Sequence, residues 1–294
     1  AGQIRLAHAY QAALARHGVS VAQVLLTLDD TEQRRRYLNA RNTIETLLKL
    51  GAVPVINEND TVATNEIRYG DNDRLAARVA AMISADTLAL FSTINGLYTA
   101  DPGKDPAATF IPEVRKLDAA IMAMAGDAPP GYSSGGMVTK LEAARVALGS
   151  GCRMVIGDGR KVHALRDLDA AARKTWFIPE GSPRASRKHW IAASLKPAGT
   201  LTVDDGARKA LRDGKSLLPA GITKVEGRFD RGDAVSVRDA RGREVARGLI
   251  AYTDAEARRL AGHKSREIQE LLGYRGRDEM IHRDDLVVLD GKDK

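Results

Sequence analysis

Apolar residues in the first part of the chain follow two patterns, helical spacing in some segments and short continuous runs in others. The helical spacing predicts helices over residues 3–16, 30–50, 72–85, 136–148 and 161–167. Asp30 and Gly51 have the residue types of an N-cap and a C-cap for the second of these helices. The continuous runs predict strands over residues 19–27, 53–57, 87–92, 152–156 and 175–178. Strands separated by helices indicate an α/β fold with a mainly parallel sheet.

The pattern changes after residue 178. Residues 179–193 are rich in Pro, Gly and Ser, which is typical of a linker. Close-set turns then separate short apolar runs, which predict strands over 199–203, 221–228, 234–238 and 245–252, with a helix over 254–260. Residues 241–244 have the chemistry of a hairpin turn. We therefore expect an α/β domain over residues 1–181, a linker over 182–193, and a small strand-rich domain over 194–290.

Composition narrows the class of protein. No apolar run among the 294 residues approaches the length of a membrane span, and residues 1–5 lack the layout of a signal peptide. Cys152 is the single cysteine, which excludes an intramolecular disulfide and a multi-cysteine metal site. It opens an apolar run, so we expect a buried strand residue there. These features favour a reducing cytoplasm and no membrane association.

The formal net charge of +7 raises the question of nucleic-acid binding. Acidic and basic residues are interspersed along both halves of the chain, and the short basic run at residues 34–36 fits a solvated helix face. The net charge alone therefore does not establish RNA or DNA binding.

Four polar residues, Asn57, Glu58, Asn59 and Asp60, follow the predicted strand that ends near residue 57. Ligands of open parallel sheets bind at the carboxyl ends of strands. Asp60 could accept a hydrogen bond from a substrate amine, and the carboxamides could donate to carboxylates. An ordinary polar loop after a strand is an equally good interpretation of these four residues alone.

A second polar group, Gly70-Asp71-Asn72-Asp73, precedes the helix predicted over residues 72–85. One interpretation is simple capping, in which Asp71 or Asn72 accepts from free N–H groups of the first helical turn. The other is that two carboxylates flanking a carboxamide orient a cationic residue or hold Mg²⁺ indirectly.

The segment Ser134-Gly135-Gly136-Met137-Val138-Thr139-Lys140 opens another predicted helix. Glycines allow backbone N–H groups to approach a phosphate, and a helix N-terminus favours an anion. Lys140 lies one turn into the helix, where it can reach back over the phosphates. The segment is not a Walker A motif, because the required spacing is absent.

These motifs, together with residues 95–102, occur in one order along the chain, and in that order they resemble the glutamate 5-kinase family. The C-terminal part resembles the small RNA-associated PUA domain, on the segments 199–204, 216–222 and 282–285. The resemblance covers nearly the whole chain, and the combination is specific where each motif alone is not.

The resemblance implies an amino-acid-kinase three-layer sandwich and transfer of the ATP γ-phosphoryl group to the γ-carboxylate of L-glutamate. This reaction is the first step of proline biosynthesis, with Mg²⁺ accompanying ATP and no metal held by the protein alone. Lys140 would stabilise the transferring group and Asp73 would orient the catalytic lysines. Glutamate would contact Asp60 and Asn72, with Asn57 as a neighbour. Nucleotide contacts would be Ser92, Thr93 and the segment Ser134, Gly135, Gly136, Met137, Val138, Thr139 and Lys140.

The family also implies a homo-oligomer, dimer or tetramer, and feedback inhibition by proline, for which we expect the loop over residues 61–69 to be the place of competition. The sequence departs from the family pattern in two places. The usual Val-Val-Lys-Xaa-Gly strand and the Ser-Gly loop after it are absent before Ala1, so we expect little activity from these 294 residues. Thr93-Ile94-Asn95 replaces an Asp-x-Asp of many relatives, which affects nucleotide contacts.

Two alternatives remain open on the sequence. Another amino-acid kinase, acting on N-acetylglutamate, aspartate or a nucleotide, would use the same fold. An RNA-binding protein would instead act through the C-terminal domain, although its mixed charge argues against strong binding to phosphates.

Overall fold

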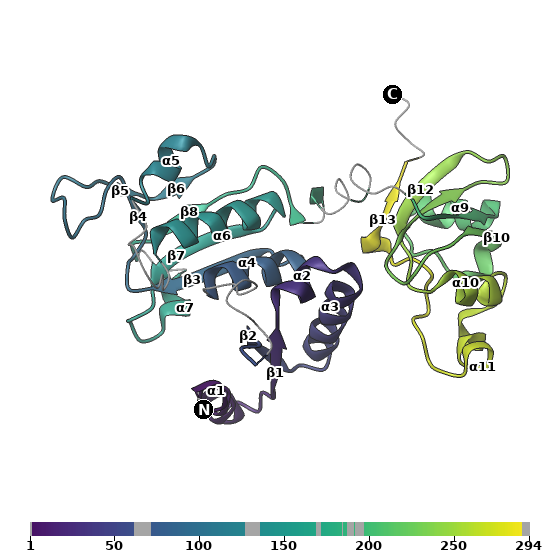
Figure 1. Ribbon diagram of the computed structural model, residues 1–294, viewed down its shortest axis with the longest axis horizontal. Coiled ribbons are helices and arrows are strands. Elements are labelled where there is room, and N and C mark those ends of the chain that lie inside the picture. The colour runs from purple at the N-terminus through teal and green to yellow at the C-terminus, as the bar shows by residue number, and fades with distance from the viewer. Residues whose placement is uncertain are drawn as a thin grey trace. The chain divides into compact units, whose positions relative to one another are not determined.

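The computed structural model describes residues 2–61, 72–126, 136–168, 172–183, 185, 186, 191 and 197–289. The chain divides into two compact units, Ala1–Pro183 and Arg184–Lys294 (Figure 1). Each unit has its own buried apolar core. Predictions that fall on residues 62–71, on Ser134 and Gly135, or on most of the linker lie outside the described residues.

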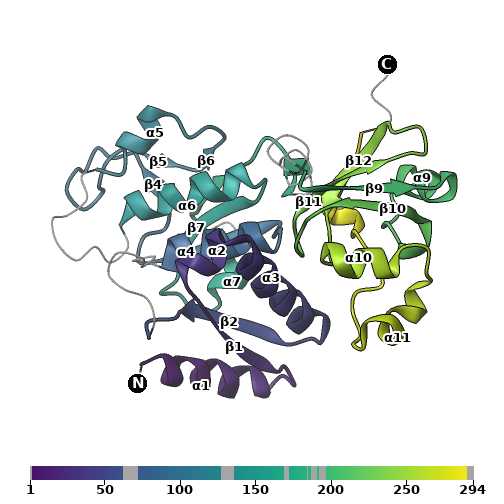
Figure 2. The ribbon, with the colours of Figure 1, turned by 45° about the vertical axis from the view of Figure 1, so that its right-hand side comes forward.

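The first unit begins with helix α1 (Gly2–Ala15) and a pair of parallel strands, β1 (Val21–Leu26) and β2 (Val53–Glu58). Their register runs from Val21 opposite Val53 to Leu26 opposite Glu58. In Figure 2 the pair lies between α1 and α3 (Arg34–Lys49). The apolar runs of the sequence predicted both strands. Asn57, one residue before the end of β2, lies opposite Leu25.

The helix predicted over residues 30–50 is two helices, α2 (Leu28–Glu32) and α3. Gln33 has an extended backbone, with φ −78° and ψ 117°, and separates them. The prediction of Asp30 as N-cap is wrong: Thr27 is the N-cap, and the Asp30 carboxylate accepts from Thr27 N at 2.7 Å. Gly51 follows the cap residue Leu50 with φ +73°, a left-handed conformation that glycine adopts without strain.

A four-stranded sheet forms the centre of the first unit, in the order β3 (Thr87–Ser92), β7 (Arg153–Asp158), β8 (Thr175–Phe177), β6 (Glu113–Val114). The β3–β7 and β6–β8 pairs are parallel, whereas β7 and β8 are antiparallel. Helices α4 (Asn72–Met82) and α6 (Met137–Gly149) lie side by side against β3 and β7 (Figure 1). The expected α/β class with mainly parallel strands is confirmed.

The segment between β3 and α6 contains short elements that the sequence pattern did not predict. Strands β4 (Leu97–Tyr98) and β5 (Phe110–Ile111) form a small antiparallel pair, and α5 (Ala119–Ala123) follows β6. Thr175, fully buried in β8, connects β4 and β5: its hydroxyl accepts from Leu97 N at 2.7 Å and donates to Ile111 O at 2.6 Å. Two-residue strands carry no detectable periodicity, so only their tertiary contacts define them.

Cys152 is fully buried, as expected, but it lies one residue before β7 rather than within it. Burial raises the pKa of its thiol to about 11, so the group is an unreactive thiol. Helix α7 (Ala164–Asp167), after β7, is shorter than the prediction over residues 161–167. Within the described part of the chain, no helix is long and apolar enough to cross a membrane.

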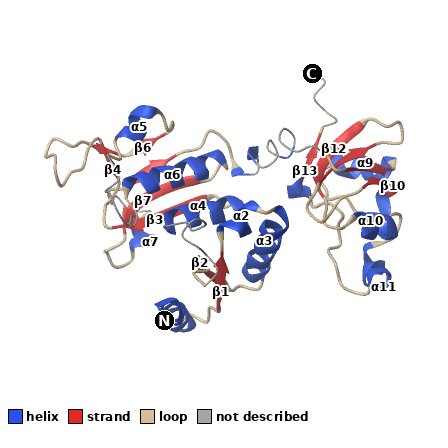
Figure 3. Ribbon diagram, viewed as in Figure 1, coloured by secondary structure: helices blue, strands red, loops and turns tan. Residues whose placement is uncertain are grey.

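The second unit has a five-stranded sheet in the order β10 (Ile222–Gly227), β9 (Gly199–Val203), β11 (Ala234–Arg238), β12 (Glu244–Leu249), β13 (Leu286–Val288). Figure 3 shows this unit as strands accompanied by short helices. Helices α9 (Asp205–Arg212), α10 (Asp254–Leu260) and α11 (Ile268–Leu272) accompany it. The pattern predicted four of the strands and α10, whereas α9, α11 and β13 were missed. Ile191 is buried against Ala234 and Leu249 of this unit.

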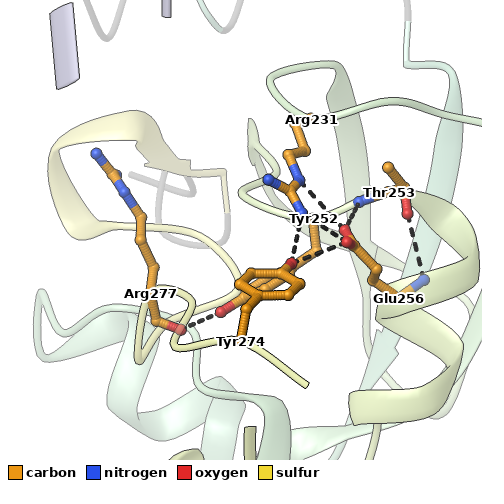
Figure 4. A network of polar contacts seen from close by, with 6 residues as sticks. All are labelled: Arg231, Tyr252, Thr253, Glu256, Tyr274 and Arg277. Carbon is orange, nitrogen blue, oxygen red and sulfur yellow. Dashed lines mark hydrogen bonds and ion pairs between the residues drawn. The ribbon is translucent and has the colours of Figure 1, made fainter. Parts of the chain in front are cut away.

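A polar network joins three segments of the second unit (Figure 4). The Glu256 carboxylate, in the first turn of α10, accepts from Thr253 N at 2.9 Å, from Arg231 Nη2 at 2.5 Å and from Tyr274 OH at 2.8 Å. The Arg231 guanidinium also lies over the Tyr274 ring, 5.3 Å from its centroid. The buried Tyr252 hydroxyl donates to the carbonyl of Arg277.

Candidate active site

A largely buried ion pair joins the two helices that carry the predicted catalytic residues. Lys140 Nζ, on α6, donates to Asp73 Oδ2, on α4, at 2.8 Å. The side chains are 8% and 17% exposed, so the contact is largely shielded from water. A lysine this buried needs a partner, because an unpaired buried charge is costly. The structure thus brings together the two residues that the sequence predicted to act together.

The packing of α4 against α6 explains why these side chains meet. Small residues on the facing surfaces, Ala77 on α4 and Ala143, Ala144 and Ala147 on α6, are fully buried. Small side chains let the two backbones approach closely, and Leu141 is buried in the same core cluster. Asp73 and Lys140 each lie in the first turn of their helix. The two helices therefore present the pair at neighbouring N-terminal ends.

The hydroxyl of Thr139 lies within hydrogen-bond distance of two acceptors, Gly136 O at 2.9 Å and Asp73 Oδ2 at 3.2 Å. Gly136 is the N-cap of α6 and has an extended backbone. Thr139 is buried and so belongs to the support of the ion pair, whereas Met137 and Val138 are half-buried beside it. The α6 N-terminus, in a helix of 13 residues, is the described part of the predicted phosphate segment.

The predicted glutamate contacts lie on neighbouring elements, because α4 contacts β2. Asn57, near the end of β2, accepts from Glu58 N through its side-chain oxygen at 2.9 Å. Asp60 is exposed and accepts from Gln3 Nε2 of α1 at 2.5 Å. Asn72 is the exposed first residue of α4, next to Asp73. The segment that joins them, residues 62–71, is outside the described residues.

A pocket lies at the carboxyl ends of β3 and β7, where ligands of parallel sheets bind. Residues of four segments line it: Phe91 and Asn95, Gly157 and Asp158, Lys161, and Arg173 and Lys174. Of the predicted nucleotide contacts, Ser92 and Thr93 fall between two lining residues, Phe91 and Asn95, but do not line the pocket. Ser92 O accepts from Gly159 N at 2.8 Å, which ties β3 to the loop after β7.

The pocket wall contains an ion pair that the sequence pattern did not single out. Arg160 Nε and Nη2 donate to the two Asp158 oxygens at 2.9 Å and 2.8 Å. These hydrogen bonds hold the pKa of the Asp158 carboxyl well below its usual range. The sequence pattern did not identify Asp158, Lys161 and Arg173 as pocket residues, because residues 153–173 carry no compact motif. The one available signal was that Asp158 ends an apolar strand.

The described residues contain no group of three His, Cys, Asp or Glu side chains arranged to hold a metal ion. The Asp73 carboxylate, which could have served such a site, is engaged by Lys140 through its Oδ2 atom.

Comparison with known proteins identifies the family. Residues 1–158 match the model of the amino acid kinase family, and residues 199–272 match the PUA domain. A glutamate 5-kinase of Paramagnetospirillum magneticum is 65% identical over 98% of this chain and 78% of its own length. Glutamate 5-kinases of Rhodospirillum rubrum and Rhizobium meliloti are 61% and 58% identical, again over 98% of this chain, and over 77% and 73% of their own lengths.

The matches extend through both units and include the α4 and α6 segments that form the ion pair. A protein at these identities shares the fold and the family of its relatives. The chain therefore belongs to the amino acid kinase family and, within it, to the glutamate 5-kinases that carry a C-terminal PUA domain.

Proposed function

We propose that this protein transfers the γ-phosphoryl group of ATP to the γ-carboxylate of L-glutamate. A γ-carboxylate oxygen attacks the γ-phosphorus, the bond from that phosphorus to the bridging oxygen breaks, and ADP leaves with its electron pair. The product is γ-glutamyl phosphate, an intermediate of proline biosynthesis. The observation that carries the proposal is the Lys140–Asp73 pair, in a chain 65% identical to a glutamate 5-kinase.

Lys140 supplies positive charge to the phosphoryl group as it moves between two anionic oxygens. Such a transfer depends on positioning and on electrostatic stabilisation rather than on covalent chemistry by the protein. At 8% exposure the Lys140 ammonium is poorly solvated, so its field on a nearby phosphate is weakly screened. Asp73 orients it through the 2.8 Å contact.

The glutamate in this proposal lies between the end of β2 and the start of α4. Asn57 and Asn72 have carboxamides that donate to carboxylates, and the Asp60 carboxylate accepts from the amino group. The interaction of Asp60 with Gln3 is an exposed hydrogen bond that a substrate amine can replace.

ATP in this proposal spans two features of the first unit. Its base and ribose occupy the pocket at the ends of β3 and β7, near Ser92 and Thr93. Its phosphates extend toward the N-terminus of α6, where the N–H groups of the first helical turn and the Lys140 side chain meet them. Mg²⁺ enters as part of the Mg–ATP substrate, which fits the preference of this ion for phosphate oxygens together with few protein ligands.

The test is γ-glutamyl hydroxamate formation by the full-length protein with Mg–ATP and hydroxylamine. L-glutamate, N-acetyl-L-glutamate and L-aspartate are compared at equal concentrations, with product measured as the ferric complex and ADP measured separately. Preference for L-glutamate is expected, because the Asp60 carboxylate accepts from a free amine and an acetyl group removes its charge. Preference for the acetylated acid would contradict the proposal and assign another amino-acid kinase.

We further propose that the protein is a cytoplasmic homo-oligomer, dimer or tetramer, and that L-proline inhibits it in competition with glutamate. The expected place of competition, residues 61–69, joins the two groups of glutamate contacts along the chain. Light scattering gives the oligomer size. Hydroxamate assays with rising L-proline at several glutamate concentrations give the type of inhibition.

RNA binding through the PUA domain is a second candidate function, supported by the family match at residues 199–272. Many of its arginines are already paired with acids of the same domain, as in Arg243 with Asp239 and Arg258 with Asp254. Paired arginines have less charge available for phosphates, so strong binding is not expected. Gel shifts with a structured RNA over a salt series test it, and tight binding with a steep salt slope would establish this function.

A further inference from the structure

Asn95 lines the pocket at the ends of β3 and β7, and its carboxamide is held in one orientation. Tyr98 OH donates to Asn95 Oδ1 at 2.9 Å. With Oδ1 turned toward Tyr98, the amide nitrogen lies on the other side of the carboxamide. No hydrogen bond to Asn95 Nδ2 occurs among the described residues. The side chain therefore offers the pocket two N–H donors.

The direction of the Tyr98 hydroxyl is set by its other neighbour. Arg173 Nη1 lies 3.4 Å from Tyr98 OH, and an arginine can only donate. The hydroxyl thus accepts from Arg173 and uses its single proton toward Asn95. Arg173 lies over the Phe110 ring, 5.1 Å from its centroid, and Phe110 meets the Tyr98 ring edge-on at 5.4 Å. Asn95 is therefore supported by an ordered stack.

The same pocket has an aromatic surface. Phe91, in the edge strand β3, is 41% exposed, and its partner across the parallel pair is Gly157. A Cβ at Gly157 would lie 3.8 Å from the Phe91 ring, and one at Gly159 would lie 2.9 Å from Phe91 Cβ. Gly157 therefore places no side chain beside the ring, and Gly159 allows the loop after β7 to approach the Phe91 backbone. An exposed ring beside oriented donors is a suitable place for a planar heterocycle to stack.

We propose that Asn95 is the residue by which the pocket recognises the base of its nucleotide, with Tyr98 as its positioning residue. The Asn95 Nδ2 donors meet an unprotonated ring nitrogen of an adenine-type base while Phe91 stacks on the ring. This inference rests on the proposed use of ATP and names the group that selects its base.

Calorimetry on the full-length protein measures the binding of Mg–ATP and of Mg–tripolyphosphate. The comparison separates the contribution of the base to binding from that of the phosphates. Asn95→Ala is expected to raise the dissociation constant for ATP about 5- to 20-fold, the worth of one hydrogen bond, and to leave that for tripolyphosphate unchanged. Asn95→Asp keeps the shape of the side chain but replaces its N–H donors with a carboxylate. It should weaken ATP binding at least as much as Asn95→Ala.

Tyr98→Phe keeps the stack with Phe110 and removes only the hydroxyl. A rise of about 3-fold in the dissociation constant for ATP is expected, and little further loss when Tyr98→Phe is added to Asn95→Ala, since the two groups act as one unit. Asn39→Asp adds the same charge as Asn95→Asp on the exposed face of α3, and is the matched control. It should bind ATP as the unchanged protein does.

The outcomes separate this inference from the function on which it rests. If Asn95→Ala weakened the binding of ATP and of tripolyphosphate equally, or left ATP binding unchanged, the role of Asn95 would be overturned. Hydroxamate formation would still support the kinase function in that case. Normal ATP binding without any hydroxamate from L-glutamate would overturn the proposed substrate and leave the role of Asn95 standing. No binding of ATP by the unchanged protein would overturn both.

Discussion

Lys140 on α6 and Asp73 on α4 are separated by 66 residues of chain between them and by 2.8 Å in space. Each of the two charged side chains depends on the other helix for its partner. The alanine-lined contact between α4 and α6 sets the distance, and the low exposure of both side chains makes the interaction stronger than a surface ion pair.

Lys140→Met is expected to lower kcat for γ-glutamyl phosphate formation by about 10²- to 10³-fold, because the transferring phosphoryl group loses a preorganised cation. Lys140→Arg keeps the charge but replaces a compact ammonium with a planar fork, so it should recover only part of the rate. Steady-state hydroxamate assays of the full-length protein measure both. A Lys140→Met protein with normal kcat would contradict the catalytic role.

Asp73→Asn is expected to lower kcat with little change in the KM for glutamate, because it leaves Lys140 charged but without its orienting carboxylate. Removing one partner of a buried pair also destabilises the first unit by about 3 kcal/mol. Urea titrations measure the stability, and kinetics measure the split between kcat and KM.

Glu142→Gln is the matched control for Asp73→Asn on the same helix pair. Arg74 Nε donates to Glu142 Oε2 at 2.7 Å, but the side chains are 45% and 36% exposed. An exposed pair contributes at most about 1 kcal/mol, so this variant should keep both stability and kcat. Equal losses in both variants would mean that general helix packing, not the Lys140–Asp73 contact, controls activity.

Glu256 makes the stability of the second unit depend on acid pH. Burial alone would raise the pKa of its carboxyl, but hydrogen bonds from Arg231, Thr253 N and Tyr274 outweigh burial and lower the pKa to about 2. A carboxyl whose pKa is depressed by folding stabilises the native state above its unfolded value of about 4.5. This stabilisation is lost as the pH falls from about 4.5 toward 2.

Glu256→Gln should therefore cost about 1–2 kcal/mol of unfolding free energy at pH 6, after allowing for partial solvent screening, and much less at pH 3. Urea titrations at both pH values, read on the unfolding of the second unit, measure the difference. Glu270→Gln, on exposed α11, is the control and should change stability little at either pH. A cost for Glu256→Gln that is the same at both pH values would contradict the linkage.

Thr175→Val is expected to destabilise the first unit by about 2–4 kcal/mol, because Leu97 N and Ile111 O lose a fully buried partner. Thr175→Ser keeps the hydroxyl and should lower the stability of the first unit clearly less than Thr175→Val does. Since Leu97 precedes Tyr98, the valine variant should also weaken ATP binding, whereas the serine variant should not. Thermal unfolding and calorimetry measure the two effects, and equal stability of both variants would contradict the role of the hydroxyl.

Much of the fold followed from local patterns. The limits of β3 were predicted to the residue, and those of β2, α4 and α6 to within three residues, because each is an apolar-rich segment with glycine or polar residues near its ends. The break at Gln33 was missed because residues 29–36 contain no apolar residue whose spacing could show it, and no glycine or proline that would mark it. Thr27 fixes the start of α2 through its contact with Asp30. The elements β4, β5 and α5 were missed because they are too short to show a period.

The sequence by itself determined which residues could carry the chemistry and in what order: the carboxylates before α4, the glycines and lysine at the start of α6, and the strand-rich C-terminal domain. These are local facts of composition and spacing. The tertiary structure alone decided that Asp73 faces Lys140, that Arg173 reaches the Tyr98 hydroxyl beside Asn95, and that Phe91 lies opposite Gly157. Each depends on a contact between segments far apart in the chain, and no local pattern records the packing that creates it.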